Sequence, residues 1–186
     1  MCLTSPCSRL TSTSVAPLAF ATEGQGVGPT DQRLNQMVVD GTEESRQAGF
    51  DERKSKVYED HTARIMEIFK EIGYPSATLV GEEASEAFWL LVQHSDSKPM
   101  FQEEVLLAMK PVVLAGEASN ESLALLTDRV RINTDRPQLY GTQVEFDVSL
   151  GRATPKQLEE PRMVDRRRAE VGLGPLWEAW VRCGNT

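Results

Sequence analysis

The chain has 186 residues, of which 20 are Lys or Arg and 28 are Asp or Glu, giving a formal net charge of -8 at pH 7. This length is sufficient for one domain whose hydrophobic core needs no metal or disulfide support. The negative charge repels phosphate backbones and anionic headgroups, so we expect neither nucleic acid nor a membrane surface as a partner.

Cysteine and histidine are too sparse for a multi-ligand metal centre. Cys2 and Cys7 lie near the start of the chain and Cys183 near its end, without the paired spacing of a zinc site. His61 and His94 are the only histidines. We therefore expect no cofactor and no metal site, although the composition leaves a carboxylate site for a hard cation open.

The first part of the chain has the composition of a disordered leader. Residues 1–29 are rich in Ser, Thr, Gly and Pro and show no hydrophobic periodicity. A short apolar run at 14–21 ends in Ala-Phe-Ala, a pattern similar to the cleavage site of a weak export signal. Pro17 interrupts that run, so we expect a cytoplasmic protein, with export as the alternative. A single helical domain is predicted over residues 30–186.

Helical periodicity begins after the leader. A helix is predicted at 31–48, and a firmer one at 51–72 ends before Gly73. Residues 73–83 suggest a loop with a short extended piece. The apolar face of the firmer helix is formed by Val57, Ile65, Ile68, Phe69 and Ile72.

The third predicted helix, at 82–95, has the pattern of a central core helix. Acidic residues occupy its first turn, where they favour the positive end of the helix dipole. No stretch in the chain reaches the roughly 20 apolar residues of a transmembrane helix. The apolar stripe of this helix contains Ala84, Ala87, Phe88, Leu91 and Val92.

Two further helices follow. Ser97 is the predicted cap of the fourth helix, which extends to residue 116 and is expected to kink or restart at Pro111. Ser119 or Asn120 caps a fifth helix over residues 121–132.

The last third of the chain contains the only strand pattern. Residues 144–148 alternate apolar and polar side chains, and Gly151 can turn the chain into a second strand. A helix ending at Gly172 and a short helix around Trp177 and Trp180 complete the domain. The predicted fold is mainly α, an irregular multi-helix bundle with one small β-hairpin near 143–158.

Three polar clusters lie at or beyond helix ends: "QHSD" at 93–96, "DR" at 128–129 and "QLYGTQ" at 138–143. If the third and fifth helices lie side by side, their C-terminal ends converge on one rim. We therefore predict a pocket there that holds a small-molecule or peptide ligand.

His94 is the predicted proton-transferring group, because histidine changes charge near neutral pH. Asp96 or Asp128 would orient its imidazole, and Tyr140 would donate to developing negative charge. Ligand binding is assigned to a further set of polar residues: Gln93, Arg129, Gln138, Gln143 and Arg168.

Each assignment has a structural alternative. His94 can be a hydrogen-bonded histidine at the core edge, and Arg129 can cap the neighbouring loop. The amides of Gln138 and Gln143, with Tyr140, can satisfy buried backbone groups of a turn. No catalytic signature such as a nucleophile elbow or a P-loop is present.

Several segments resemble a family of uncharacterised bacterial domains of unknown function. They are "GYPSATLVGEEASEAFWLLVQHSD", "LALLTDRVRINTDRPQLYGTQ" and "VDRRRAEVGLGPL", and the resemblance covers residues 57–180. The family's usual Gly-Trp-Pro, Gln-His-Ala-Asp and Ala-Tyr-Leu-x-Asp-Arg elements differ here at Tyr74, Ser95 and Leu125. The resemblance groups the polar positions together without implying a reaction.

Two functions remain open from the sequence. The first is an acid/base enzyme, similar to a hydrolase, that uses His94 on a small polar or peptide-like substrate. The second is a non-catalytic ligand-binding or protein-interaction domain in which the same polar residues are structural.

Overall fold

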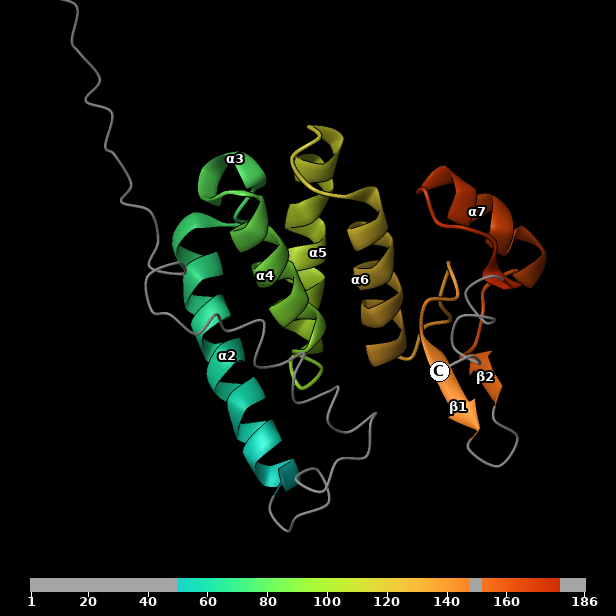
Figure 1. Ribbon diagram of the computed structural model, residues 1–186, viewed down its shortest axis with the longest axis horizontal. Coiled ribbons are helices and arrows are strands. Elements are labelled where there is room, and N and C mark those ends of the chain that lie inside the picture. Colours follow the sequence, from blue (N-terminus) through green and yellow to red (C-terminus); the bar gives the residue numbers. More distant parts are fainter. Residues whose placement is uncertain (1–49, 148–151, 178–186) are drawn as a thin grey trace, which may run out of the picture.

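The structure is a computed structural model that describes residues 50–147 and 152–177, the latter with side chains from residue 154. These residues form a mainly helical fold with one small antiparallel sheet, as predicted (Figure 1). The predicted leader, the helix at 31–48 and Trp180 lie outside the described residues. None of the described helices is both long enough and apolar enough to cross a membrane.

The helical layer is built around α4. Figure 1 shows α2, α4, α5 and α6 side by side, with α3 at one end, and α4 contacts each of the other four. The prediction of a central core helix is therefore confirmed. The bounds are α2 Phe50–Ile72, α3 Ala77–Val80, α4 Glu82–Gln93, α5 Pro99–Leu114 and α6 Asn120–Asn133.

A single core fills the space between these helices. Its fully buried side chains come from all four long helices, and each contributes about 1.5–3 kcal/mol to folding through burial. The periodic apolar positions of the sequence predicted this packing because residues three or four apart share one helix face. The largest of these side chains include Phe88, Ile65, Met109, Leu126 and Val105.

The C-terminal part lies beyond α6 in Figure 1. Strands β1 Val144–Asp147 and β2 Arg152–Pro155 pair antiparallel, with Val144 opposite Pro155, which confirms the predicted hairpin. A 3-10 helix, η2 Pro161–Met163, leads into α7 Val164–Glu170. The predicted end of this helix at Gly172 is confirmed to within two residues.

Three local predictions were wrong. Residues 77–80 form a short helix, because Val80 and Gly81 donate N–H groups to Ser76 and Ala77 carbonyls instead of pairing as an extended piece. Lys98, not Ser97, is the N-cap of α5, without a side-chain hydrogen bond. Helix α5 does not restart at Pro111, since the buried side chains on either side keep it packed in the core, and the alternative of a kink there stays a prediction.

The cap predicted for α6 is present. The Ser119 hydroxyl accepts hydrogen bonds from the N–H groups of Glu121 and Ser122 at 3.1 and 3.2 Å. Such a cap stabilises a helix by about 1 kcal/mol.

Helices α4 and α6 run in the same direction. Trp89 in α4 donates its indole N–H to the Ser122 carbonyl in α6 at 3.0 Å, and beyond the end of α4 Asp96 contacts Arg129. Both contacts join residues 33 positions apart, so the two helices keep one register along their length. Their C-terminal ends therefore meet at one rim, as predicted.

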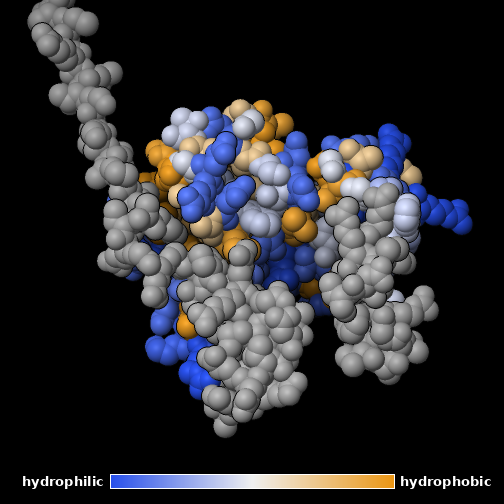
Figure 2. Space-filling view, in the orientation of Figure 1, coloured by the Kyte–Doolittle hydropathy of each residue, from blue (hydrophilic) through white to orange (hydrophobic). Residues whose placement is uncertain are grey.

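Exposed large hydrophobic side chains lie on several described elements, and three of them, Met100, Leu107 and Leu114, recur at a spacing of seven residues on α5. The others include Leu79 in α3 and Met163 in η2. On the face shown in Figure 2, hydrophobic and hydrophilic residues are intermixed.

The loop from α6 to the hairpin turns at Gly141. This buried glycine has φ +68°, and a Cβ added there would lie 2.7 Å from Leu176 Cδ1. Gly172 has a similar φ of +84°, but a Cβ there would meet nothing within 4 Å. Only the first position requires glycine for space as well as for backbone conformation.

We predict that Gly141→Ala lowers the free energy of unfolding by about 2–4 kcal/mol, through left-handed strain and overpacking against Leu176. The matched Gly172→Ala variant experiences the strain alone and should lose about 1–2 kcal/mol. Urea denaturation measures both values. Equal losses in the two variants would contradict the close packing around Gly141.

Candidate functional site

The buried carboxylate of Asp128 holds the loop that follows α6. Its side chain is fully buried and accepts hydrogen bonds from the backbone N–H groups of Leu139 (2.7 Å), Tyr140 (3.1 Å) and Thr142 (2.9 Å). The Thr142 hydroxyl donates a further bond at 2.9 Å. One carboxylate thus satisfies four hydrogen-bond donors of the loop.

Gln138 joins the same loop to the hairpin. Its fully buried amide donates to the carbonyls of Gln143 (2.8 Å) and Lys156 (2.9 Å), and its oxygen accepts the Gln143 N–H at 2.8 Å. The backbone of Gln138 also pairs with Gln157 and Glu159. These contacts match the structural alternative for this residue, a turn whose amides satisfy backbone groups.

Arg168 approaches this loop from α7. Its guanidinium is buried and donates to the carbonyl oxygens of Tyr140 (2.7 Å) and Gly174 (2.6 Å). Burial lowers the pKa of Arg168, while Asp165 and Asp128 oppose that effect with their negative charge. Burial also raises the pKa of the half-buried Tyr140 phenol, and Asp128 adds to the increase.

Asp96 forms a second polar centre, at the rim where α4 and α6 end. Arg129 donates two hydrogen bonds to the Asp96 carboxylate, from Nε to Oδ1 at 2.8 Å and from Nη2 to Oδ2 at 2.7 Å. Asn133 donates to Oδ1 at 2.8 Å, and the buried Gln102 amide lies 3.4 Å from it. Burial alone would raise the pKa of Asp96, but the bonds and charge of Arg129, with Asn133 and Gln102, hold it below its usual value.

Arg129 also connects the two polar centres. Its Nη1 donates to the side-chain oxygen of Gln143 at 3.0 Å. Gln143 belongs to the loop that Asp128 and Gln138 organise, so the rim and the loop share one hydrogen-bond network. The predicted loop contact of Arg129 is thus present.

A cavity of about 330 Å³ opens beside this rim. The His94 ring lies in its wall, directly after the last residue of α4, and stacks on Tyr58 of α2 with centroids 5.4 Å apart and an angle of 14° between planes. The cavity therefore lies between α2 and the shared end of α4 and α6. Its lining consists of Lys54, Ser55, Tyr58, Glu59, His94, Asp96, Ser97 and Arg129.

The structure brings some of the predicted site residues together and separates others. His94, Asp96 and Arg129 line the cavity, and Gln143 adjoins it through Arg129. A second group bonds the loop or its neighbours instead: Asp128, Gln138 and Arg168. Tyr140 lies in that loop.

Gln93 is a special case. It is buried, and its side-chain nitrogen has no hydrogen-bond partner within the part of the chain that the structure describes. The catalytic and ligand-binding roles of all these residues stay predictions.

Sequence reasoning missed the cavity-lining residues Lys54, Ser55, Tyr58, Glu59 and Ser97 and the rim residues Gln102 and Asn133. Tyr58 lies one helical turn before the buried Thr62, which bonds Ser95 at 2.9 Å, so helical spacing from Thr62 would have indicated that face. Gln102 is a lone amide on the apolar face of α5 and donates to the Val92 carbonyl at 2.9 Å. A buried amide within a hydrophobic stripe is the signal that was overlooked.

The cavity carries charges of both signs. Lys54 and Arg129 supply positive charge, and Glu59 and Asp96 supply negative charge. Within residues 50–147 and 152–177, no group of three or more His, Cys, Asp or Glu side chains is placed to hold a metal ion. The wall suits a polar ligand that offers both an anionic group and hydrogen-bond donors.

The model of the Family of unknown function (DUF6624) matches residues 21–185. The chain belongs to this family. The match confirms the resemblance to a domain of unknown function and extends it beyond residues 57–180. No curated protein and no solved structure matches the chain. For this DUF6624 domain, functional inference therefore depends on the geometry of its own residues.

We predict that Asp128→Asn destabilises the DUF6624 domain by about 2–4 kcal/mol, because an amide NH2 would face backbone N–H donors in a buried position. The same change at the exposed Asp135 should stay within about 0.5 kcal/mol. Chemical denaturation of both variants gives the comparison. A loss below about 1 kcal/mol at Asp128 would show that its four bonds contribute little.

Asp96→Asn should cost about 1 kcal/mol at pH 7, a value limited by solvent screening because the Asp96 side chain is 48% exposed. The lowered pKa of this carboxyl contributes stability above the ordinary value of 3.8 and loses it as the pH falls further. The difference between wild type and variant should therefore shrink below about pH 4. Thermal melts between pH 7 and pH 3 test this, and a constant difference would contradict it.

Proposed function

We propose that this domain is an acid/base enzyme that acts on a small polar substrate with an anionic group, with His94 as the residue that exchanges a proton. The observation that carries the proposal is the position of the imidazole in an open cavity that Arg129 also lines, stacked on Tyr58. Catalytic imidazoles work best when a packed neighbour fixes the ring plane.

Arg129 is suited to bind the anionic group of the substrate. A guanidinium carries five N–H donors, and three of them make the bonds to Asp96 and Gln143. Within the part of the chain that the structure describes, the other two donors make no hydrogen bond and can face a substrate carboxylate, and Lys54 adds a second positive charge in the same wall. A peptide-like compound with a terminal carboxylate fits this pattern.

The other predicted residues act through position in this proposal. Asp96 holds Arg129 in place, because both of its oxygens accept hydrogen bonds from the guanidinium. Asp128 acts less directly, because it holds the loop that carries Gln143, and Gln143 in turn bonds Arg129. Both are positioning residues.

Hydrolysis is the reaction class that one imidazole can support with these partners. The imidazole takes a proton from water, whose oxygen attacks the acyl carbon, and the imidazolium then returns that proton to the leaving group. Such proton transfer contributes about 10²–10⁴-fold to a rate.

A non-catalytic ligand-binding domain is the second candidate. It is favoured by the bonding of Asp128, Gln138 and Arg168, whose described hydrogen bonds go to other parts of the protein. In that case the His94 cavity binds the same class of ligand without converting it.

We predict that the wild type hydrolyses N-acyl amino acids such as hippurate and that His94→Ala reduces turnover at least 100-fold. Liberated glycine is quantified by chromatography, and ligand affinity by calorimetry. His61→Ala is the matched control, since His61 is the other histidine of the chain and does not line the cavity; it should retain full turnover.

The outcomes separate the two candidates. The non-catalytic function would be established by two results together. The wild type would bind hippurate without turnover, and Arg129→Gln would weaken that binding at least tenfold. A fall in melting temperature above about 5 °C in His94→Ala would assign that residue to the fold instead. Equal turnover in wild type and His94→Ala would reject the acid/base role.

A further inference from the structure

A second cavity, of about 290 Å³, lies at the opposite end of α4. Four of its lining residues come from the first eight residues of that helix: Glu82, Ser85, Glu86 and Trp89. Twelve residues of helical rise, about 18 Å, separate Glu82 from His94. The cavity is therefore distinct from the site of the proposed function.

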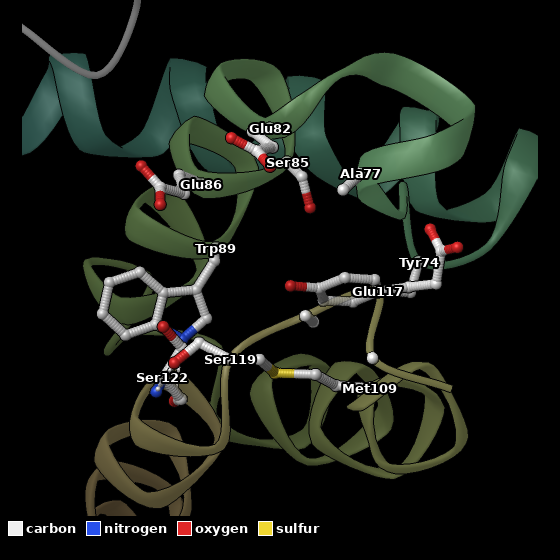
Figure 3. A pocket seen from close by; sticks show the side chains of 12 residues that line it. Tyr74, Ala77, Glu82, Ser85, Glu86, Trp89, Met109, Glu117, Ser119 and Ser122 are labelled. Atoms are coloured by element: carbon white, nitrogen blue, oxygen red, sulfur yellow. Dashed lines mark hydrogen bonds between the residues drawn. The ribbon is translucent and has the colours of Figure 1, made fainter. Parts of the chain in front are cut away.

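Aromatic and apolar side chains form the body of this cavity. Figure 3 shows Tyr74 extending across it, with its hydroxyl group towards Trp89, while Ser85 and Met109 lie on opposite sides. The Trp89 indole N–H donates a hydrogen bond to the Ser122 carbonyl at 3.0 Å. The Tyr74 ring packs edge-on against Phe88, with ring centroids 5.8 Å apart. Both rings are thus fixed before any ligand arrives.

The phenol of Tyr74 is a neutral hydrogen-bonding group. Burial raises its pKa, and a hydrogen bond with Ser85 offsets part of that increase. At neutral pH the two hydroxyl groups can accept hydrogen bonds from a ligand donor.

The charge on the wall is negative. Three carboxylates line the cavity, those of Glu82, Glu86 and Glu117, and none of the described residues that line it is Lys, Arg or His. The N-terminal ends of α4 and α6 also meet the cavity and supply about +0.5 each, so about two negative charges remain. An anionic ligand is therefore disfavoured.

Glu117 is a fixed part of that charge. Its carboxylate accepts hydrogen bonds from the N–H and hydroxyl of Thr78 at 2.8 and 2.6 Å. These bonds lower the pKa of Glu117, so it stays ionised. Glu82 and Glu86 are exposed, and Figure 3 shows Glu82 beside Ser85 and Glu86 on the side of Trp89.

We propose that this cavity binds a small organic ammonium ion whose apolar part lies between Tyr74 and Trp89. Aromatic faces attract a desolvated ammonium group by about 2 kcal/mol, and the carboxylates of the lining add Coulombic attraction. The acidic residues alone would attract any cation, but fixed aromatic walls select one with an apolar body. The cavity volume suits a ligand of modest size.

The experiment uses three probes with the same phenyl-and-two-carbon frame: 2-phenylethylammonium, 2-phenylethanol and 3-phenylpropionate. The full chain is labelled at its tryptophan indole nitrogens, and the Trp89 signal, assigned with a Trp89→Phe variant, reports binding by NMR titration. We expect saturable binding of the ammonium probe, at least tenfold tighter than the alcohol, and none of the carboxylate probe.

A double variant, Glu82→Gln with Glu86→Gln, should bind the ammonium probe at least tenfold more weakly than the wild type does. Its affinities for the ammonium probe and the alcohol should then be equal. Glu83→Gln is the matched control, because Glu83 is exposed in the same turn and does not line the cavity. His94→Ala should bind the probe as the wild type does, so the two proposals fail separately. Equal affinity for ammonium and alcohol, equal losses in the double variant and the control, or no saturable binding would overturn the proposal.

Discussion

The buried carboxylate of Asp128 joins the two parts of the described structure. It projects from α6 and bonds the loop that leads into the hairpin, and Arg168 of α7 holds the same loop through the Tyr140 carbonyl. An ionised group in a dry interior costs several kcal/mol unless bonds and opposite charge compensate. Here four donors and the electrostatic attraction of Arg168 provide that compensation. The position of Gln143 beside the His94 cavity depends on this arrangement.

The rim around Asp96 depends on a similar compensation nearer the solvent. Helices α5 and α6 both contribute to it, through Gln102 and Asn133, which also bond each other at 2.9 Å. Gln102 in addition caps the end of α4 by donating to Val92. The same side-chain amides, those of Gln102 and Asn133, thus hold Asp96 in the cavity wall and connect three helices. Substitutions at the rim should therefore affect stability as well as the cavity wall.

Helix positions were largely predictable, because the apolar residues of α2, α4 and α6 recur at helical spacing and the core is built from them. The rim was predictable as well, since parallel neighbours place their ends together. The predictions that failed concern features that depend on tertiary contacts. The segment before α4 became helical where Ala77 bonds Glu117 from another helix end. The sequence also could not distinguish the roles of Asp128 and Asp96. Asp128 lies near the end of one helical pattern and Asp96 just beyond another, and only the burial of Asp128 separates a residue that holds the loop from one that lines the cavity.

The shared direction of α4 and α6 places their C-terminal ends beside one cavity and their N-terminal ends beside the other. The first cavity carries charges of both signs, from Lys54, Arg129, Glu59 and Asp96. The charged side chains among the described lining of the second are all acidic: Glu82, Glu86 and Glu117. Since one helix spans the distance, inserting or deleting a turn of α4 would shift the cavities relative to each other by about 5.4 Å. The described linings of the two cavities share no residue, so a substitution in one leaves the side chains of the other unchanged.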